Sequence, residues 1–193
     1  MKIPEPIVPD WEILSHDALV SMVDSTPADA LAAAERMYKQ AMDVADERNA
    51  ARCLIVMGMA YNRLADYNLS LEKLHEALSA FQKLDSKDDE AQCIIAIAAS
   101  CIAFGDYNKA LEHLFKALAL TDITGNKKCE SDALLRVAIC HMRMGETDKA
   151  RQTNLRVLKV AEAMNDIRTI GVVQNNLGNI CGMQKDSAGA LVH

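Results

Sequence analysis

Residues 90–120 read EAQCIIAIAASCIAFGDYNKALEHLFKALAL and contain one complete copy of a unit that recurs along most of the chain. The first part, residues 93–104, is apolar almost all the way round, so it must be covered on more than one side. The second part, residues 107–120, has apolar residues at helical spacing along one face. A Gly105-Asp106 break separates them. Such a helical hairpin cannot bury its own surface, so the pattern predicts neighbouring hairpins of the same kind.

The composition favours helices and excludes several classes of partner. Half of the 193 residues are hydrophobic but only 4% are aromatic, which predicts a core of Ala, Leu, Ile, Val and Met. All four prolines lie at or before Pro27, so none interrupts a helix after it. The formal charge of −6, with no cluster of Lys and Arg, argues against nucleic acid or an anionic membrane as a partner.

The chain carries no recognisable targeting or membrane-spanning segment. The first residues, MKIPEPIVPDWEIL, lack an apolar stretch of signal-peptide length, and no later run is long enough to cross a bilayer. We therefore expect a cytoplasmic protein. The cysteines form no C-x-x-C pair and fit buried thiols in a reducing compartment. They are Cys53, Cys93, Cys101, Cys129, Cys140 and Cys181.

A period of forty residues, without gaps, relates the copies of the unit. Small residues recur at one fixed position on each helix, which allows the two helices of a hairpin to approach closely. On the first helix these residues are Gly58, Ala98, Ala138 and Gly178, with Ala18 in register; on the second they are Ser70, Ala110, Ala150 and Ala190, with Ala30 in register. The pattern predicts an all-α fold, a right-handed α-solenoid of antiparallel helix hairpins.

The period also sets the expected boundaries. Residues 1–9 form an extended lead-in, after which Asp10 caps a helix and Trp11, Ile13 and Leu14 dock onto the first hairpin. The array fills residues 10–193, with full repeats at about 10–47, 50–87, 90–127 and 130–167 and a truncated fifth at 170–193, whose two helices carry Gly178 and Ala190. A solenoid normally ends in a polar capping helix. We therefore expect further sequence after residue 193.

The repeat resembles the tetratricopeptide repeat family across nearly the whole chain. The matching residues are Leu54, Met57, Gly58 and Tyr61, then Tyr67, Ser70, Leu74 and Ala77, and in the next copy Gly105, Asp106, Tyr107, Ala110, Leu114 and Ala117. The usual Pro at the end of the second helix is replaced by Met42, Gln82, Asp122 and Glu162, and Asn154 occupies a normally bulky position. The period exceeds the usual thirty-four residues, adding roughly 9 Å of helix per unit. This resembles the longer repeat of bacterial regulatory proteins.

No motif for catalysis or for a cofactor is present. The P-loop, dinucleotide-binding, H-E-x-x-H and G-x-S-x-G patterns are absent, and the five histidines are scattered. The acidic segment 85–90 lacks the Gly and the ligand spacing of a calcium loop, and we interpret it as a solvated turn whose acids favour the following helix. We expect no catalytic residue, metal or cofactor in this chain.

The resemblance implies a ligand groove lined by the first helices of successive units. Its family positions fall on Ile55, Met59, Asn62, Gln92, Ile95, Ala99, Ile102, Asp132, Leu135, Arg136, Ile139, Arg143, Asn175 and Asn179. Ile55, Met59, Ile95 and Ala99 stand where a carboxylate clamp needs Lys and Asn, so that activity is excluded. If the apolar strip of the groove is exposed, we expect a partner to cover it: an amphipathic helix, a second copy of the chain or another domain of the same protein. Alternatively, tight superhelical winding buries these side chains. Asn175, Asn176 and Asn179 could hold a peptide backbone.

Two functional hypotheses follow, and both act through binding. In the first, the chain is the sensory or assembly region of a larger bacterial signalling protein, which forms a homodimer or binds a ligand and thereby regulates an output domain after residue 193. By family analogy that domain is a diguanylate cyclase (GGDEF), a histidine kinase or a DNA-binding domain, and of these we favour the cyclase. In the alternative, the chain is a peptide-pheromone-type receptor or docking scaffold whose groove binds a protein or peptide. A third reading, an enzyme within these residues, lacks a converging nucleophile, base or metal set.

Overall fold

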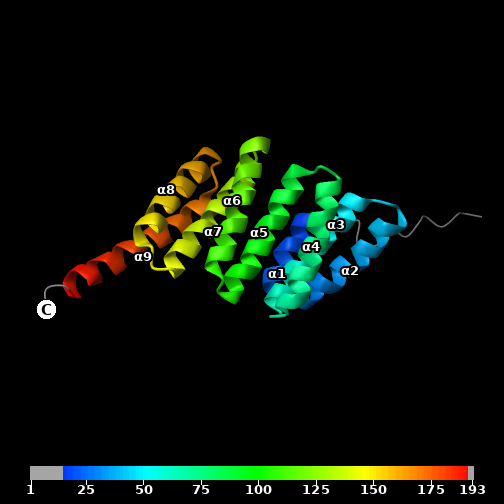
Figure 1. The fold of residues 1–193 in the computed structure, drawn as a ribbon, viewed down its shortest axis with the longest axis horizontal. Helices are drawn as coiled ribbons and strands as arrows, with labels where there is room; N and C mark the ends of the chain where they lie inside the picture. Colours follow the sequence, from blue (N-terminus) through cyan, green and yellow to red (C-terminus); the bar gives the residue numbers. More distant parts are fainter. Residues whose placement is uncertain (1–14, 191–193) are drawn as a thin grey trace, which may run out of the picture. The chain divides into compact units, whose positions relative to one another are not determined.

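The computed structural model of the protein describes residues 15–190, and the side chains of residues 15–182. This described part consists of nine helices and contains no strand, which confirms the predicted all-α fold (Figure 1). The helices are α1 (His16–Ser25), α2 (Pro27–Asp43), α3 (Glu47–Arg63), α4 (Tyr67–Lys83), α5 (Lys87–Phe104), α6 (Tyr107–Thr124), α7 (Lys127–Arg143), α8 (Thr147–Ala163) and α9 (Ile167–Ala190). The expected docking of Trp11, Ile13 and Leu14 falls outside the described residues.

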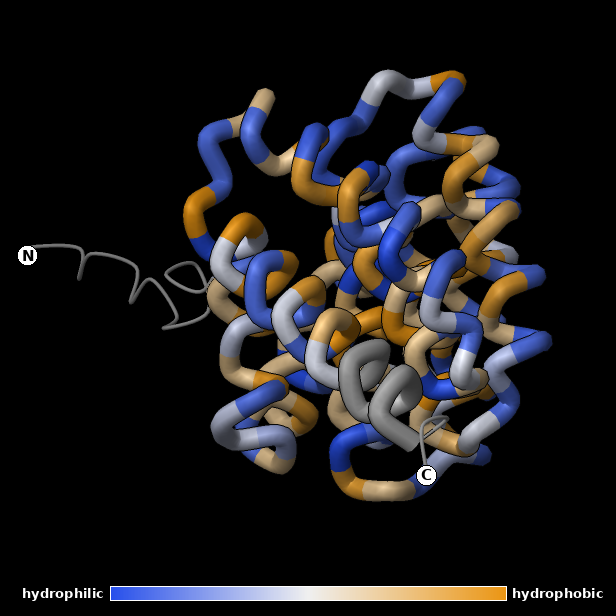
Figure 2. The backbone as a smooth tube through the Cα atoms, turned by 90° about the vertical axis from the view of Figure 1, so that its left-hand side faces the viewer, coloured by the Kyte–Doolittle hydropathy of each residue, from blue (hydrophilic) through white to orange (hydrophobic). Residues whose placement is uncertain are grey.

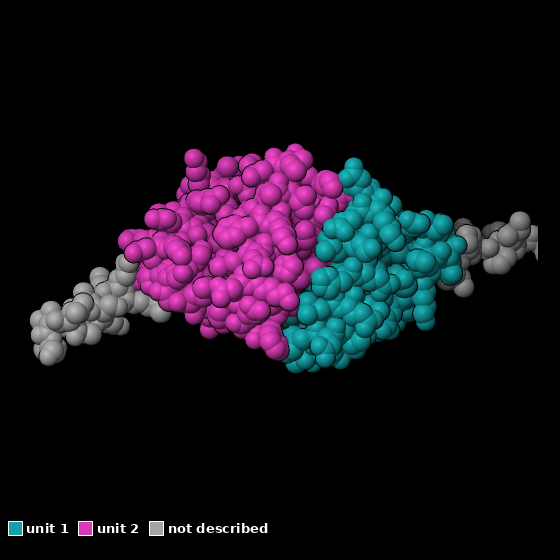
Figure 3. Space-filling model, viewed as in Figure 1, with its two compact units in different colours: residues 1–85 teal, residues 86–193 magenta. Residues whose placement is uncertain are grey.

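The chain divides into two compact units, residues 1–85 and residues 86–193 (Figure 3). In unit 1, α1 packs against α2 and α3, and α3 also packs against α2 and α4. In unit 2, α5 packs against α6 and α7, α6 also packs against α7, and α8 contacts both α7 and α9. Within each unit, both helices of the leading hairpin therefore contact the first helix of the next hairpin.

The two helices of the second hairpin approach most closely at Gly58. A Cβ atom placed on Gly58 would lie 2.5 Å from Leu74 Cγ and 3.1 Å from the carbonyl oxygen of Ser70. Leu74 and Ser70 are both fully buried, so neither can move away easily. The small residues one period later, Ala98 and Ala110, are also fully buried. The size pattern in the sequence therefore marks the contact between the helices of a hairpin.

Hydrophobic and hydrophilic residues alternate along the described backbone (Figure 2), and helix α4 shows how they divide between two faces. In α4, the side chains of Leu74, Ala77 and Phe81 are completely buried, whereas the intervening residues 75, 76 and 79 are exposed. Buried residues at this spacing line one face of a helix. No helix within residues 15–190 combines the length and the apolar character needed to cross a lipid bilayer.

A residue in the left-handed conformation ends a helix at every twentieth position. These residues are Ala45, Ala65, Asp85, Gly105, Gly125, Gly145 and Asn165, with φ between 50° and 89°. After α3, the Asp66 N–H donates to the Tyr61 carbonyl at 2.9 Å and the Ala65 N–H to the Asn62 carbonyl at 3.1 Å, which is a Schellman motif. The Asp66 carboxylate then accepts the Leu69 N–H at 3.2 Å and caps α4. The three residues 64–66 thus end α3 and begin α4.

Two sequence-based expectations are corrected. Gly178 and Ala190 do not lie on two helices, because α9 continues without a turn from Ile167 to Ala190. The acidic segment 85–90 is a solvated turn only at Asp85, and its other acids lie in the first turn of α5 as expected, but Asp89 and Glu90 are buried there, at 1% and 8% exposed. Local bonds compensate part of this burial, since the Ser86 hydroxyl donates to Asp89 at 2.6 Å and the Lys87 ammonium lies 3.3 Å from Glu90.

The close approach at Gly58 generates a prediction with a matched control. Gly58→Ala should lower the free energy of unfolding by about 1–3 kcal/mol, because the added methyl group overlaps the buried Leu74 side chain. Gly178 in α9 occupies the same position of the repeat, but no atom lies within 4 Å of a methyl group added there. Gly178→Ala should therefore raise the free energy of unfolding by about 0.5–1 kcal/mol through helix propensity. Urea denaturation followed by circular dichroism measures both. A shift of both variants in the same direction would contradict this packing.

Candidate binding site

The predicted groove residues all lie on the first helices of the hairpins, but their burial differs sharply. On α3 and α5, Ile55 and Ile95 are each only 3% exposed and belong to the core. Met59, Asn62, Ala99 and Ile102 are half-buried, and Gln92 is exposed. On α7, Asp132 and Arg143 are exposed while Leu135, Arg136 and Ile139 are half-buried, and on α9 Asn175 and Asn179 are exposed. An open apolar strip is therefore the wrong interpretation at Ile55 and Ile95, where the alternative of burial holds.

Most of the exposed groove positions lie on α7 and α9, whereas on α3 and α5 only Gln92 is exposed. We call the part of the groove on α7 and α9 the α7–α9 surface and define it by Asp132, Leu135, Arg136, Ile139, Arg143, Asn175 and Asn179. A buried cluster of Leu134, Val157 and Val173, one from each of α7, α8 and α9, joins the two helices. Leu135 packs against this cluster, so the surface rests on a fixed core.

The polar groups of the α7–α9 surface differ in what they can still bind. Arg136 Nε lies 3.2 Å from Asp132 Oδ1, an i, i+4 ion pair along α7. Arg143 lies two turns further along the same helix and is exposed. Asn175 and Asn179 are four residues apart on α9, so their amides share one face, and each can both donate and accept hydrogen bonds. Such a surface can bind the backbone of a peptide and an acidic side chain.

Asn154, which departs from the repeat, turns out to position α9. Its side chain is completely buried, its Nδ2 donates to the Ala150 carbonyl at 2.9 Å, and its Oδ1 accepts from Asn176 Nδ2 at 3.2 Å. The departure is therefore compensated, and α8 forms a full helix. All three asparagines of α9 were predicted to bind a peptide backbone, but the Asn176 amide instead donates to Asn154 and holds α9 against α8.

The titratable side chains show no arrangement for metal chemistry. Within the described residues, no three or more His, Cys, Asp or Glu side chains come together in a way that could hold a metal ion. His141 Nδ1 lies 2.6 Å from Glu146 Oε2, and the Lys149 ammonium lies 2.8 Å from the other oxygen of Glu146. Hydrogen bonds from Lys149 and His141 lower the pKa of Glu146. This cluster joins the end of α7 to the start of α8 and has a structural role.

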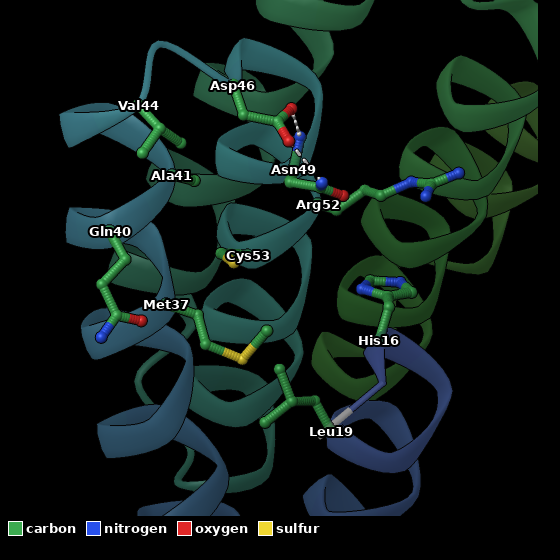
Figure 4. A pocket seen from close by; sticks show the side chains of 10 residues that line it. All are labelled: His16, Leu19, Met37, Gln40, Ala41, Val44, Asp46, Asn49, Arg52 and Cys53. Carbon is green, nitrogen blue, oxygen red and sulfur yellow. Dashed lines mark hydrogen bonds between the residues drawn. The ribbon is translucent and has the colours of Figure 1, made fainter. Parts of the chain in front are cut away.

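Two cavities in unit 1 were not predicted from the sequence. One, of about 370 Å³, lies among α2, α3 and α4, where Lys73 is already paired with Glu72 and Glu76 at 3.1 and 3.3 Å. The other, of about 350 Å³, lies among α1, α2 and α3 (Figure 4). No motif in the sequence indicated either cavity.

Comparison with known proteins supports the tetratricopeptide repeat family and shows its solenoid fold. The sequence profile of that family, described as Tetratricopeptide repeat, matches residues 49–122, and the profile of anaphase-promoting complex subunit 5 matches residues 94–183. No curated protein sequence matches the chain.

Solved structures of similar fold cover nearly all of this chain. A Rap protein complexed with competence and sporulation factor matches with a TM-score of 0.76 at 14% identity over 93% of this chain and 55% of its own. Aspartyl phosphate phosphatase F from Bacillus subtilis matches with a TM-score of 0.77 at 12% identity, over 94% and 49%. The TPR-like repeats of a putative kinesin light chain from Podosopora anserina match with a TM-score of 0.65 at 14% identity, over 92% and 89%. The chain thus has a TPR-like α-solenoid fold and spans about half the length of the first two of these proteins.

Burial predicts which cysteines react in the folded protein. It raises the pKa of the Cys53 and Cys140 thiols to about 11 and of Cys93 and Cys129 to about 12, so few thiolates form at neutral pH. Cys181 is exposed, whereas the other five are buried. Alkylation with iodoacetamide, followed by mass spectrometry, should therefore modify Cys181 alone in the native protein and all six cysteines in urea. A Cys181→Ser variant is the control and should take up no label when folded; rapid native labelling of Cys93 or Cys129 would contradict the burial.

Proposed function

We propose that this chain, whose repeats match the tetratricopeptide family over residues 49–122, is a non-catalytic protein-interaction module that binds a peptide on the α7–α9 surface. The observation that carries the proposal is the combination on this surface of exposed Arg143, Asn175 and Asn179 with the half-buried apolar side chains of Leu135 and Ile139. A rigid scaffold with a few polar groups around an apolar floor is the usual composition of a recognition site.

The chemistry of the surface specifies the class of ligand. The two asparagine amides suit an extended peptide backbone, because each can donate to a carbonyl and accept from an N–H. Arg143 suits an acidic side chain, and Leu135 with Ile139 suits an apolar one. The ligand we propose is therefore a short peptide with an acidic and an apolar residue. The matching Rap structure, which is complexed with competence and sporulation factor, supports a binding role for a solenoid of this fold.

A finer proposal is that such a module regulates a diguanylate cyclase domain. That proposal depends on family analogy, and the structural comparisons give more support to the peptide-binding alternative. Both forms share the same step, the occupation of a surface by a partner. They differ in whether the partner is a peptide or a second copy of the chain.

Peptide binding predicts a defined loss in an asparagine variant. Peptides selected from a random display library on the purified protein should bind the Asn175→Ala/Asn179→Ala variant about tenfold more weakly, because two hydrogen bonds of roughly 0.5–1 kcal/mol each are lost. Isothermal titration calorimetry measures the affinity. Lys159→Ala, an exposed change on α8, is the matched control and should bind like the unaltered protein. Peptides that bind the asparagine variant normally but lose affinity for the α8 control would contradict this site.

The homodimer form makes its own prediction. If a second copy occupies the α7–α9 surface, light scattering should give an average mass above 21.2 kDa that increases with concentration. Ile139→Glu should return the mass to that of one chain with unchanged helicity, because Ile139 is only half-buried and the introduced charge would be desolvated at the interface. A mass that stays at 21.2 kDa at every concentration would rule out the dimer and leave peptide binding intact.

A further inference from the structure

Two large apolar side chains are exposed on the second helices of the hairpins in unit 2. Phe115 of α6 and Leu155 of α8 are 55% and 51% exposed. They are forty residues apart in the sequence, so they occupy the same position of the repeat. In unit 1 that position is polar, with Glu35 and His75. A surface position that is apolar in one unit only indicates contact with a partner rather than with water.

The two apolar side chains lie on helices that flank a third helix. Helices α6 and α8 both pack against α7 (Figure 1). Leu118 and Leu158, about one turn after Phe115 and Leu155, both pack against the buried cluster formed by α7, α8 and α9. Helices in contact lie about 8–10 Å apart, so two helices that contact a third are at most about 20 Å apart. One partner element can therefore contact both side chains.

A basic residue follows each of the two apolar residues. Lys116 on α6 and Arg156 on α8 are both exposed. Neither forms an ion pair with an acidic side chain among the described residues. In unit 1 the same position carries Arg36 and Glu76, so only unit 2 has a basic residue on both helices. The apolar residues of α6 and α8 are therefore each accompanied by an available positive charge.

We call this region the α6–α8 surface and define it by Phe115, Lys116, Arg151, Leu155, Arg156 and Lys159. Arg151 and Lys159 are exposed and lie four residues before and after Leu155, so they flank it along the face of α8. Within four residues of Phe115 or Leu155, Glu112 is the single acidic residue. Four basic groups against one acidic group make this surface positive, although unit 2 as a whole has no net charge.

The chemistry of the α6–α8 surface specifies what it can bind. Exposed apolar residues flanked by basic groups complement an amphipathic helix that carries apolar residues on one face and acidic residues beside them. Four turns of such a helix measure about 22 Å, which is enough to reach from α6 to α8. Hydrogen bonds between the arginine guanidinium groups and its carboxylates would fix its orientation.

We propose that the α6–α8 surface docks an acidic amphipathic helix of a partner protein. Phe115 and Leu155 are its apolar anchors, and Lys116 and Arg156 pair with its acidic side chains. This surface is formed by the second helices of the hairpins, whereas the α7–α9 surface lies on first helices. The proposal is therefore independent of peptide binding at the α7–α9 surface.

A pair of synthetic peptides tests the proposal on the whole chain. The probe is an amphipathic peptide of about eighteen residues with leucine on one face and glutamate beside it, and its counterpart has lysine at every glutamate. In fluorescence anisotropy the glutamate peptide should bind saturably, and about tenfold more tightly than the lysine peptide. Raising NaCl from about 50 to about 500 mM should weaken its binding several-fold, because salt screens exposed charges. Equal affinities for the two peptides, or no binding of the glutamate peptide, would overturn the proposal.

Variants of exposed residues locate the binding of the glutamate peptide. Phe115→Ser/Leu155→Ser and Lys116→Glu/Arg156→Glu should each weaken it about tenfold, because the first removes the apolar anchors and the second reverses the charge. The circular dichroism spectra should be unchanged, since all four side chains are exposed. Val44→Ser, which removes an apolar side chain that is 75% exposed in unit 1, is the matched control and should bind normally. The charge variant keeps the test decisive if the serine variant folds poorly.

Two other outcomes would overturn the proposal by assigning a different site or a different occupant. Loss of binding in Asn175→Ala/Asn179→Ala, with normal binding in Phe115→Ser/Leu155→Ser, would place the peptide on the α7–α9 surface. In light scattering, a dimer that dissociates in Phe115→Ser/Leu155→Ser would show that a second copy of the chain covers the α6–α8 surface.

Discussion

The close approach of two helix backbones inside each hairpin is the constraint on which the rest of the structure depends. At Gly58 the space for a side chain is already taken by Leu74, so the second hairpin has this geometry only while position 58 lacks a Cβ atom. The same small position recurs as Ala98 and Ala138, both fully buried. Because the contact repeats every forty residues, each hairpin presents the same faces to the next, and large apolar residues can fill the space between hairpins.

The turns maintain this repetition. A left-handed residue every twenty positions follows each of the helices α2 to α8, which are all 17 or 18 residues long. Most of the next residues are Asp or Asn whose side chains cap the following helix, as Asp106 and Asn126 do. The left-handed position is glycine at 105, 125 and 145 but Ala, Asp or Asn elsewhere, so at Ala45 and Ala65 the backbone geometry is imposed although the residue does not favour it. Each turn forms hydrogen bonds with the end of one helix and the start of the next. A turn of fixed length between helices of similar length explains why the forty-residue period has no gaps.

The sequence predicted the helical fold and the hairpin contacts well, because both depend on residue size at a fixed spacing. It could not predict how deeply a position is buried between neighbouring hairpins. Ile55 and Ile139 have similar side chains and both lie at predicted groove positions, yet the first is core and the second is half-buried. The role of Asn154 was also hidden, since its partner Asn176 lies on another helix and no local pattern joins them. The solvation expected for residues 85–90 failed at Asp89 for the same reason, because charge suggested solvent where this side chain is buried.

One register position supports the proposal that recognition takes place at the α7–α9 surface. Along the period it is occupied by Ile55, Ile95, Leu135 and Asn175, and its exposure rises from core to surface in the same order. Where the repeat keeps its apolar residue, the position serves packing; where it changes to an amide, the position is free to bind. The charge distribution adds to this argument. Residues 1–85 carry eight basic and fourteen acidic side chains, whereas residues 86–193 carry thirteen of each, so the whole net charge of −6 resides outside unit 2. Unit 2 therefore has no net charge with which to steer a ligand over long distances. If the proposed peptide binds there, its selection would come from short-range contacts with groups such as Arg143 and Asn179 rather than from long-range attraction.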